Sequence, residues 1–286
     1  MPKRTAEKNI IHSRFVLMII LIAIPFLGLG LWSKFTISNK VVERQKTLLK
    51  ANRVNIETFF EVIGNSVSVL ARVDSVKVNN TQITKDLDIF MEEWQDSGLI
   101  GGIVLVDEEG QVDFNSNILG VPDIGMSLAD RDYFTWAKNL GKEGDYFVGR
   151  AVVSRLGGSK GQIIIPVASP VLKNGKFSGV MVAAVKLDTL NKRFLGLMDI
   201  SNSTKVYLVN VEGAVIYSND SLEKVGKNIE ELEGNLKNVR YTTKEGIICG
   251  GGNITAFSPV DLGDRKWLLI MSSLSNEIDS CLSRRS

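Results

Sequence analysis

Aliphatic residues recur every seven positions through residues 34–75. They are Val42, Leu49, Ile56, Ile63 and Leu70. Seven residues correspond to two helical turns, so these side chains share one face and the segment is predicted to form a long helix. Two interpretations of the stripe stay open. It packs on a sheet of the same chain, or its N-terminal half forms a seam with a second copy, which would make the protein a homodimer.

An apolar run precedes this helix. Phe15 to Trp32 contains eighteen residues without a charge, and at about 1.5 Å per residue such a helix nearly spans a hydrocarbon core of about 30 Å. Basic residues lie before it, at Lys3, Arg4, Lys8 and Arg14. The positive-inside rule then predicts a cytoplasmic N-terminus over residues 1–14, a transmembrane helix over 15–33 and an extracytoplasmic remainder. The chain is thus predicted to be a single-pass protein of the cell (inner) membrane. A cleaved signal peptide is disfavoured because no small-residue cleavage site follows Trp32.

Strand-like apolar runs dominate the middle of the chain. They are Tyr146–Ser154, Gly161–Leu172 and Phe177–Leu187. Turn-forming residues separate them at 157–160 and 173–176, which predicts an antiparallel meander. A short helix is predicted just before the runs, because Ser127 precedes Asp130 by three residues in the spacing of a capping box.

An internal repeat relates the two halves of the folded part. Leu105–Phe114 matches Leu208–Tyr217, each with an acidic turn that ends in glycine between two apolar segments. A Ser-Pro-Val triplet precedes a later strand-like run in both halves, at 169–171 and at 258–260. Such self-similarity predicts a duplicated structural unit.

The predicted fold is therefore of the α+β class, with an N-terminal transmembrane helix, a long outer helix and two PAS-like antiparallel-sheet modules. The modules span 76–190 (distal from the membrane) and 191–278 (proximal), and residues 279–286 form a tail. A helix over Asp188–Met198, capped by Asp188, is predicted to join them. Residues 228–236 are predicted to form a short helix or loop.

Composition narrows the function. The 286 residues carry a formal net charge of +2, which argues against a nucleic-acid partner. The single histidine, His12, lies before the apolar run, so no histidine-based triad or zinc site is expected in the folded part. Cys249 and Cys281 make neither a disulfide scaffold nor a metal knuckle. We therefore predict no enzyme, no cofactor and no metal.

A cation lies among aromatic residues at the predicted helix start. Arg131 is surrounded in sequence by Tyr133, Phe134 and Trp136. A guanidinium and aromatic rings above a sheet suit a small anionic or amphipathic ligand. The alternative is that Arg131 pairs at the surface with a nearby carboxylate, and that the rings belong to the core.

The layout resembles the double Cache family of extracytoplasmic sensors, found in bacterial chemoreceptors, sensor kinases and diguanylate cyclases. The resemblance covers Thr36 to Ile278. It rests on Asp130-Arg131-Asp132-Tyr133-Phe134, on Tyr146 to Arg150, on Asn174 to Val180 and on Lys186 to Leu190.

The resemblance implies a ligand site. In amino-acid-binding members an Arg followed by two aromatics holds the ligand carboxylate, a pattern matched here by Arg131, Tyr133 and Phe134. The family's amine-binding Asp falls on Ala184 and an upstream Tyr falls on Met126, so a bound ammonium group would lack its counter-charge. The expected ligand therefore carries a carboxylate or other anion, and an amine is not required. The predicted ligand-binding residues are Arg131, Tyr133, Phe134, Tyr146 and Arg150.

The predicted function is that of a membrane-anchored small-molecule sensor in signal transduction or chemotaxis. An amino acid remains among the candidate ligands. After Trp267–Ser273 no second eighteen-residue apolar run follows, so the output function is expected to lie elsewhere, in a cytoplasmic output protein that the sequence does not identify. Three alternatives stay open: a truncated receptor, one half of a split receptor, or a stand-alone anchored binding protein. The alternative function is a structural or adhesive ectodomain that binds a protein partner and no small ligand.

Overall fold

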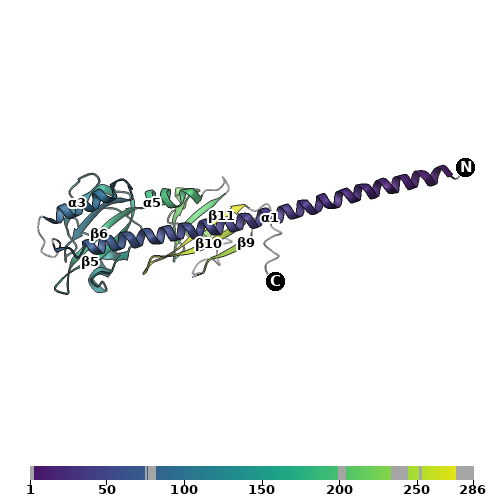
Figure 1. Ribbon diagram of the computed structural model, residues 1–286. Coiled ribbons are helices and arrows are strands. Elements are labelled where there is room, and N and C mark those ends of the chain that lie inside the picture. The colour runs from purple at the N-terminus through teal and green to yellow at the C-terminus, as the bar shows by residue number, and fades with distance from the viewer. Residues whose placement is uncertain are drawn as a thin grey trace.

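A computed structural model describes residues 3–74, 76, 82–198, 204–232, 244–250 and 253–274. Helix α1 (Lys3–Leu70) runs along both modules, and its N-terminal part projects beyond them (Figure 1). The predicted long helix is confirmed, ending at Leu70, and it is continuous with the predicted membrane segment 15–33. Most side chains of that segment lie outside the described residues. In the part of the chain that is described, no helix combines the length and apolar character needed to cross a membrane.

Two antiparallel sheets follow the helix, which confirms the α+β class. The first has the order β2-β1-β6-β5-β3, with β4 also paired to β5, and the second has the order β8-β7-β11-β10-β9. The first sheet is built from β1 (Ile100–Val106), β2 (Val112–Asn117), β3 (Phe147–Val148), β4 (Val152–Val153), β5 (Ile163–Lys173) and β6 (Lys176–Lys186). The second is built from β7 (Lys205–Asn210), β8 (Val215–Ser218), β9 (Gly246–Gly250), β10 (Asn253–Asp261) and β11 (Lys266–Leu274).

Short helices connect and cover the strands. They are α3 (Gln82–Gln95), α4 (Asp132–Asn139), α5 (Leu187–Phe194) and α6 (Ile229–Leu232), with 3₁₀ turns η1 (Gly157–Ser159), η2 (Gly196–Met198) and η3 (Leu222–Lys224). Helix α5 lies between the two sheets in sequence, as predicted. Its N-cap is Lys186 and not Asp188, because β6 runs directly into the helix.

The predicted duplication is confirmed by the pairing of individual residues. In β1–β2 the register shifts between the pairs Leu105↔Phe114 and Val106↔Val112. The same shift occurs in β7–β8 between Leu208↔Tyr217 and Val209↔Val215. The matched sequence segments therefore form the same bulged hairpin in each module.

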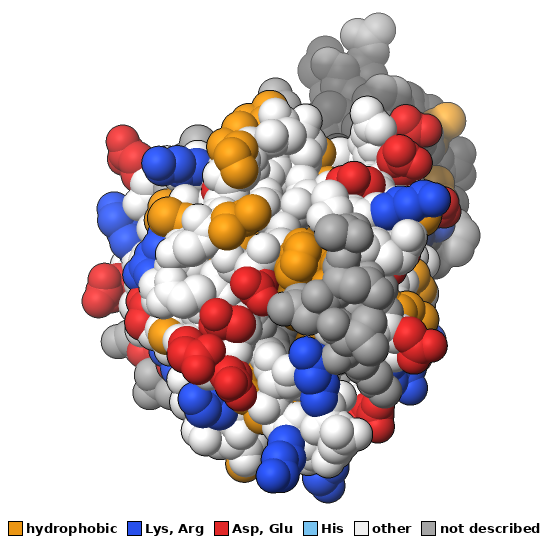
Figure 2. Space-filling view, turned by 90° about the vertical axis from the view of Figure 1, so that its left-hand side faces the viewer, with side chains coloured by type: hydrophobic (Ala, Val, Ile, Leu, Met, Phe, Trp, Pro, Cys, Tyr) orange, Lys and Arg blue, Asp and Glu red, His pale blue; other side chains and the backbone are white. Residues whose placement is uncertain are grey.

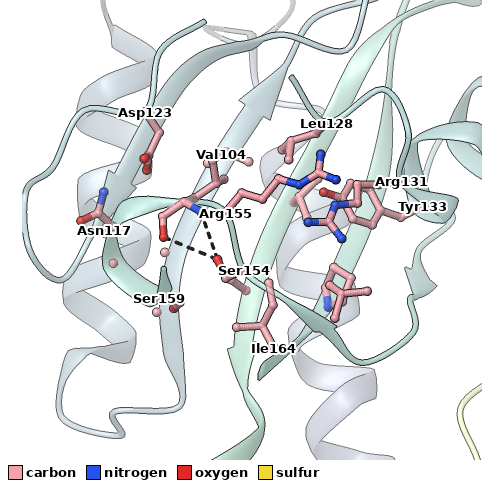
Figure 3. Close-up of a pocket in the computed structure, with 18 of the residues that line it drawn as sticks. Val104, Asn117, Asp123, Leu128, Arg131, Tyr133, Ser154, Arg155, Ser159 and Ile164 are labelled. Atoms are coloured by element: carbon pink, nitrogen blue, oxygen red, sulfur yellow. Dashed lines mark hydrogen bonds between the residues drawn. The ribbon is translucent and has the colours of Figure 1, made fainter. Parts of the chain in front are cut away.

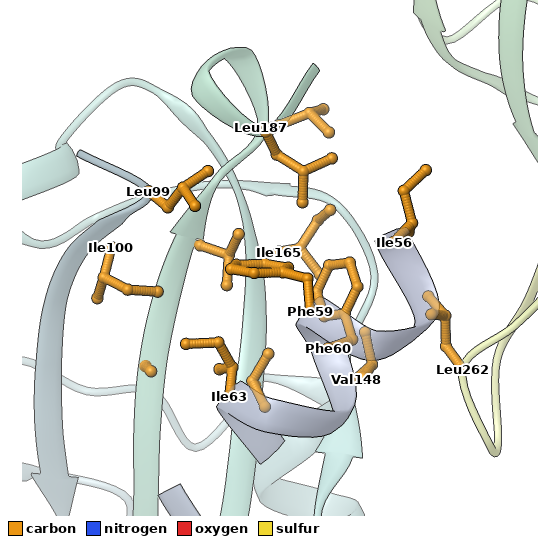
Figure 4. Close-up of a cluster of buried hydrophobic side chains, with 14 of the residues drawn as sticks. Ile56, Phe59, Phe60, Ile63, Leu99, Ile100, Val148, Ile165, Leu187 and Leu262 are labelled. Carbon is orange, nitrogen blue, oxygen red and sulfur yellow. The ribbon is translucent and has the colours of Figure 1, made fainter. Parts of the chain in front are cut away.

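The heptad stripe of α1 packs on the sheets of its own chain. All five stripe residues are buried, from 0% exposed at Ile56 and Ile63 to 9% at Leu70. Helix α1 contacts β5 and β6 of the first sheet and β10 and β11 of the second. Phe60, next to Phe59 in Figure 4, also packs edge-to-face on Trp267, with ring centroids 5.5 Å apart. One apolar core thus joins both modules to the helix.

Two local predictions need correction. The run Tyr146–Ser154 pairs antiparallel with β5, as the predicted meander requires, but it forms two short strands, β3 and β4, and not one. Pro166 of β5, which has no amide hydrogen for the ladder, lies between their partner residues. The N-cap of α4 is Arg131, and no side chain caps it, so the capping box proposed for Ser127 and Asp130 is absent. The β5–β6 turn is confirmed, with Asn174 and Gly175 both at positive φ, as a tight hairpin requires.

The far end of the distal module carries charged side chains of both signs, interspersed over the surface (Figure 2). This mixture agrees with the near-neutral composition.

Candidate functional site

A small cavity lies on the face of the first sheet that points away from α1. Its volume is about 40 Å³, enough for a few water molecules. The alternation of the strands explains its floor. Val182 and Ala184 of β6 face the cavity. The alternate residues of the same strand, Met181 and Ala183, face the core under α1. Val104, Ile164 and Pro166 complete the apolar floor from β1 and β5.

Arg131 contributes a guanidinium group to this cavity from the start of α4 (Figure 3). Its Nη2 donates a hydrogen bond to the carbonyl oxygen of Val153, at 3.2 Å. Among the described residues no carboxylate forms an ion pair with it. Asp130 pairs instead with Arg155, and Asp132 pairs with Arg265. The structure therefore does not support the alternative in which Arg131 forms an ion pair with a neighbouring carboxylate.

Arg155 supplies a second guanidinium, which sequence reasoning missed. Its side chain reaches across the cavity toward Arg131 (Figure 3). Both of its terminal nitrogens donate to the two carboxylate oxygens of Asp130, at 2.7 Å each. This bidentate bond lowers the pKa of Asp130 below its ordinary value. Arg155 and Asp130 are 25 residues apart, and no local pattern signals the contact.

Polar groups line the opposite side of the cavity. Ser159 is 3% exposed, and its Oγ has no hydrogen-bond partner among the described residues. Ser154 Oγ accepts a bond from the Leu156 amide, at 3.2 Å. Asp123 also lines the cavity, and its Oδ1 accepts a bond from the Gly157 amide at 2.8 Å. The Gly-Gly-Ser segment, which the sequence identifies only as a turn, thus forms part of the wall.

The structure brings two of the five predicted ligand residues to the cavity, Arg131 and Tyr133. Tyr133 is 4% exposed, and burial raises the pKa of its phenol. Phe134 instead packs against Phe177, with centroids 5.8 Å apart.

The remaining two predicted residues lie elsewhere. The ring of Tyr146 lies against Gly64 of α1, on the other face of the sheet, and burial raises its pKa. The side chain of Arg150 is 70% exposed and lies 3.8 Å from Asp132. A ligand-binding role for any of the five stays a prediction.

Comparison with known proteins identifies the family. The family model described as "Cache domain" matches residues 33–280. No curated protein matches the chain.

Solved structures share the fold. An extracellular ligand binding receptor from Desulfohalobium retbaense is 15% identical, with a TM-score of 0.68. The match covers 80% of this chain but 40% of that receptor. The ligand-binding domain of the Pseudomonas fluorescens chemoreceptor CtaA, in complex with L-serine, is 16% identical with a TM-score of 0.60. Here 83% of this chain and 98% of that domain are covered.

The ligand-binding domain of the Pseudomonas aeruginosa amino acid chemoreceptor PctC, in complex with GABA, is 18% identical with a TM-score of 0.60. That match covers 81% of this chain and 98% of that domain. At these identities the likeness is one of fold. The family match over residues 33–280 shows that the chain belongs to the Cache-domain family of ligand-binding sensor modules.

Proposed function

We propose that this protein is a membrane-anchored extracytoplasmic sensor that binds a small carboxylate in the cavity of its distal module. The observation that carries the proposal is the Arg131 guanidinium, which lines an apolar-floored cavity and has no carboxylate partner among the described residues. A charged group in such surroundings is stabilised by a counter-ion. The buried, unpartnered Oγ of Ser159 adds a hydrogen-bonding group on the same cavity.

The charges of the cavity favour an anion. Two guanidinium groups, of Arg131 and Arg155, line it together with the carboxylate of Asp123. Asp130 pairs with Arg155, so Arg131 is the guanidinium available to a ligand anion. The position of the family's amine-binding Asp is occupied by Ala184, which faces the cavity. Asp123 enters from a different segment, and the Gly157 amide already occupies one of its oxygens. An anion is therefore the required feature of the ligand. The L-serine and GABA bound by the two Pseudomonas neighbours both carry a carboxylate.

Binding requires the cavity to open, because its volume of about 40 Å³ holds only a few water molecules. Arg155 is the movable wall. Its side chain and that of Asp130 are 45% and 56% exposed, and an ion pair so exposed contributes little free energy to stability. A ligand carboxylate that replaces Asp130 as the partner of Arg155 would restore most of that energy.

The proposed signal leaves through α1. The helix packs against both modules and continues past them toward its N-terminus, where residues 15–33 would anchor it in the membrane (Figure 1). Its outward face exposes Val54, Val62 and Val69, at 44%, 46% and 56%. This face would form the homodimer contact, and ligand binding would shift the position of the two helices relative to each other.

The test is a thermal-shift and calorimetry screen of the purified full chain against acetate, succinate, L-serine, L-alanine and GABA. A ligand at 100 times its dissociation constant stabilises the folded state by about 2.7 kcal/mol. Arg131→Ala should abolish the stabilisation, whereas Arg193→Ala, an exposed arginine on α5, should leave it intact. Full affinity in Arg131→Ala would refute the assignment. No bound carboxylate, together with a captured protein partner, would favour the adhesive ectodomain.

A further inference from the structure

A larger cavity lies between the two modules. Its volume is about 270 Å³, close to the lower end of the range of small-molecule sites. The distal module contributes the segment from Arg150 to Val153 and Ile163. The proximal module contributes the β7–β8 turn around Val211 and the start of β11 at Lys266 and Trp267. The cavity is distinct from the one that holds Arg131, although Val152 lines both.

The charges on its walls are predominantly positive. Arg150, Arg265 and Lys266 line it, against the carboxylate of Glu212. Asp132 lies behind the two arginines. It binds Arg265 at 2.6 Å and lies 3.8 Å from Arg150. One carboxylate between two guanidinium groups leaves a positive charge in excess, and Arg150, the more distant and 70% exposed partner, is the one able to turn toward a ligand. Lys266 lies 3.8 Å from Asp261, but these two side chains are 55% and 62% exposed, so this ion pair is weak.

Apolar side chains stand beside these cations. Val153, Ile163 and Val211 line the cavity and are 58%, 39% and 45% exposed, so aliphatic surface from both modules faces the space between them. Trp267 and Leu187 form buried parts of the wall. Cations beside aliphatic and aromatic surface are complementary to a molecule with an anionic head and an apolar body.

We propose that this inter-module cavity is a second ligand site, which takes a small amphipathic anion of the aromatic carboxylate class. Its anionic head binds Arg150 and Lys266, and its apolar body lies between Val153 and Ile163 on one side and Val211 on the other. The proposal does not depend on the distal cavity binding a ligand. It gives Arg150 an anion-binding role away from Arg131, where the resemblance had placed it.

The experiment is isothermal titration calorimetry of the purified full chain with 2-naphthoate and with neutral 2-naphthamide. Binding of one 2-naphthoate per chain, with 2-naphthamide at least ten-fold weaker, is expected. Arg150→Gln and Val211→Asp should each weaken 2-naphthoate at least ten-fold, since a lost charged hydrogen bond is worth about 1.5–3 kcal/mol and 1.4 kcal/mol is ten-fold. Lys176→Gln, an exposed charge on the distal β5–β6 hairpin, should change nothing.

A fourth variant separates this site from the distal cavity. Ser159→Ala, which changes a residue that lines only the distal cavity, should retain 2-naphthoate binding while it weakens any small carboxylate bound there. Absence of 2-naphthoate binding, full binding in Arg150→Gln, or loss of binding in Ser159→Ala would each overturn the second site. Because Arg150 and Val211 are exposed, their variants should keep the melting temperature of the unchanged protein. An unchanged melting temperature then excludes unfolding as the cause of a weakened affinity.

Discussion

Arg265 joins the two modules, and its removal should be costly. It belongs to the turn before β11, yet its Nη2 binds Asp132 of α4 at 2.6 Å. Its Nε donates to the Val148 carbonyl at 3.3 Å, and its guanidinium lies 5.2 Å from the ring centroid of Phe147. Arg265→Met removes all three contacts while it keeps much of the aliphatic stem.

The magnitude follows from the exposure of the ion pair. The side chains of Arg265 and Asp132 are 21% and 28% exposed. Breaking a fully buried pair costs about 3–5 kcal/mol and an exposed one at most about 1 kcal/mol, so about 2 kcal/mol is expected here. The cation–π contact adds about 0.5–1 kcal/mol. Arg150, which is 3.8 Å from the same carboxylate, recovers a part. The net loss in unfolding free energy should be about 2–3 kcal/mol.

Urea and thermal denaturation of the full chain measure this loss. A change of about 2–3 kcal/mol corresponds to a melting temperature lower by about 5–10 °C in a domain of this size. The matched control is Lys192→Met, because Lys192 and Asp188 form a pair of the same 2.6 Å length with both side chains 76% exposed. It should cost about 0.5 kcal/mol or less. If Arg265→Met costs no more than Lys192→Met, the contact does not join the modules energetically.

Three further predictions concern other contacts. The bond to Arg155 lowers the pKa of Asp130 from 3.8, so the pair stabilises the fold above that pH and loses its effect as pH falls through the lowered value. Arg155→Ala should return the Asp130 pKa toward 3.8 in an NMR titration, and an unmoved pKa would contradict the pair. Gly64→Ala should lower the free energy of unfolding by about 1–3 kcal/mol, because a methyl group there overlaps the Tyr146 ring. In denaturation experiments, adding Tyr146→Ala to the same chain should remove this penalty, since the overlap is relieved. Val62→Lys with Val69→Lys, both on the exposed face of α1, should convert the proposed dimer to monomer in sedimentation velocity, and an unchanged mass would argue against that face.

The features predictable from sequence depend on local spacing. The repeat was visible because each matched segment contains its own hairpin, including the turn ending at Gly110 or Gly213 that lets the chain reverse at positive φ. The α1 stripe was visible because one helical face packs on both sheets. The surface that the stripe packs against is known only from the structure, since a seven-residue repeat is compatible with packing on a sheet or on a second helix.

The contacts that complete the site were not predictable, because they join distant residues. Arg155 meets Asp130 across 25 positions and Arg265 meets Asp132 across 133. Neither partner is marked by a local pattern. Arg150 is predicted from sequence as a second cation that shares the anion with Arg131, but it lies between β3 and β4 and lines the cavity between the modules.

The start of α4 connects the two cavities through consecutive residues. Arg131 lines the distal cavity, and Asp132 binds Arg265 of the proximal module beside the inter-module cavity. A ligand that moves the backbone at Arg131 must therefore also move the carboxylate that holds Arg265. Thermodynamic linkage makes this effect reciprocal. The factor by which a ligand in the distal cavity changes the affinity of the inter-module cavity equals the factor by which a ligand in the inter-module cavity changes the affinity of the distal one. If Asp132 carries this coupling, Arg265→Met should reduce both factors together, whereas a variant that disturbs a single cavity changes the affinity of that cavity alone.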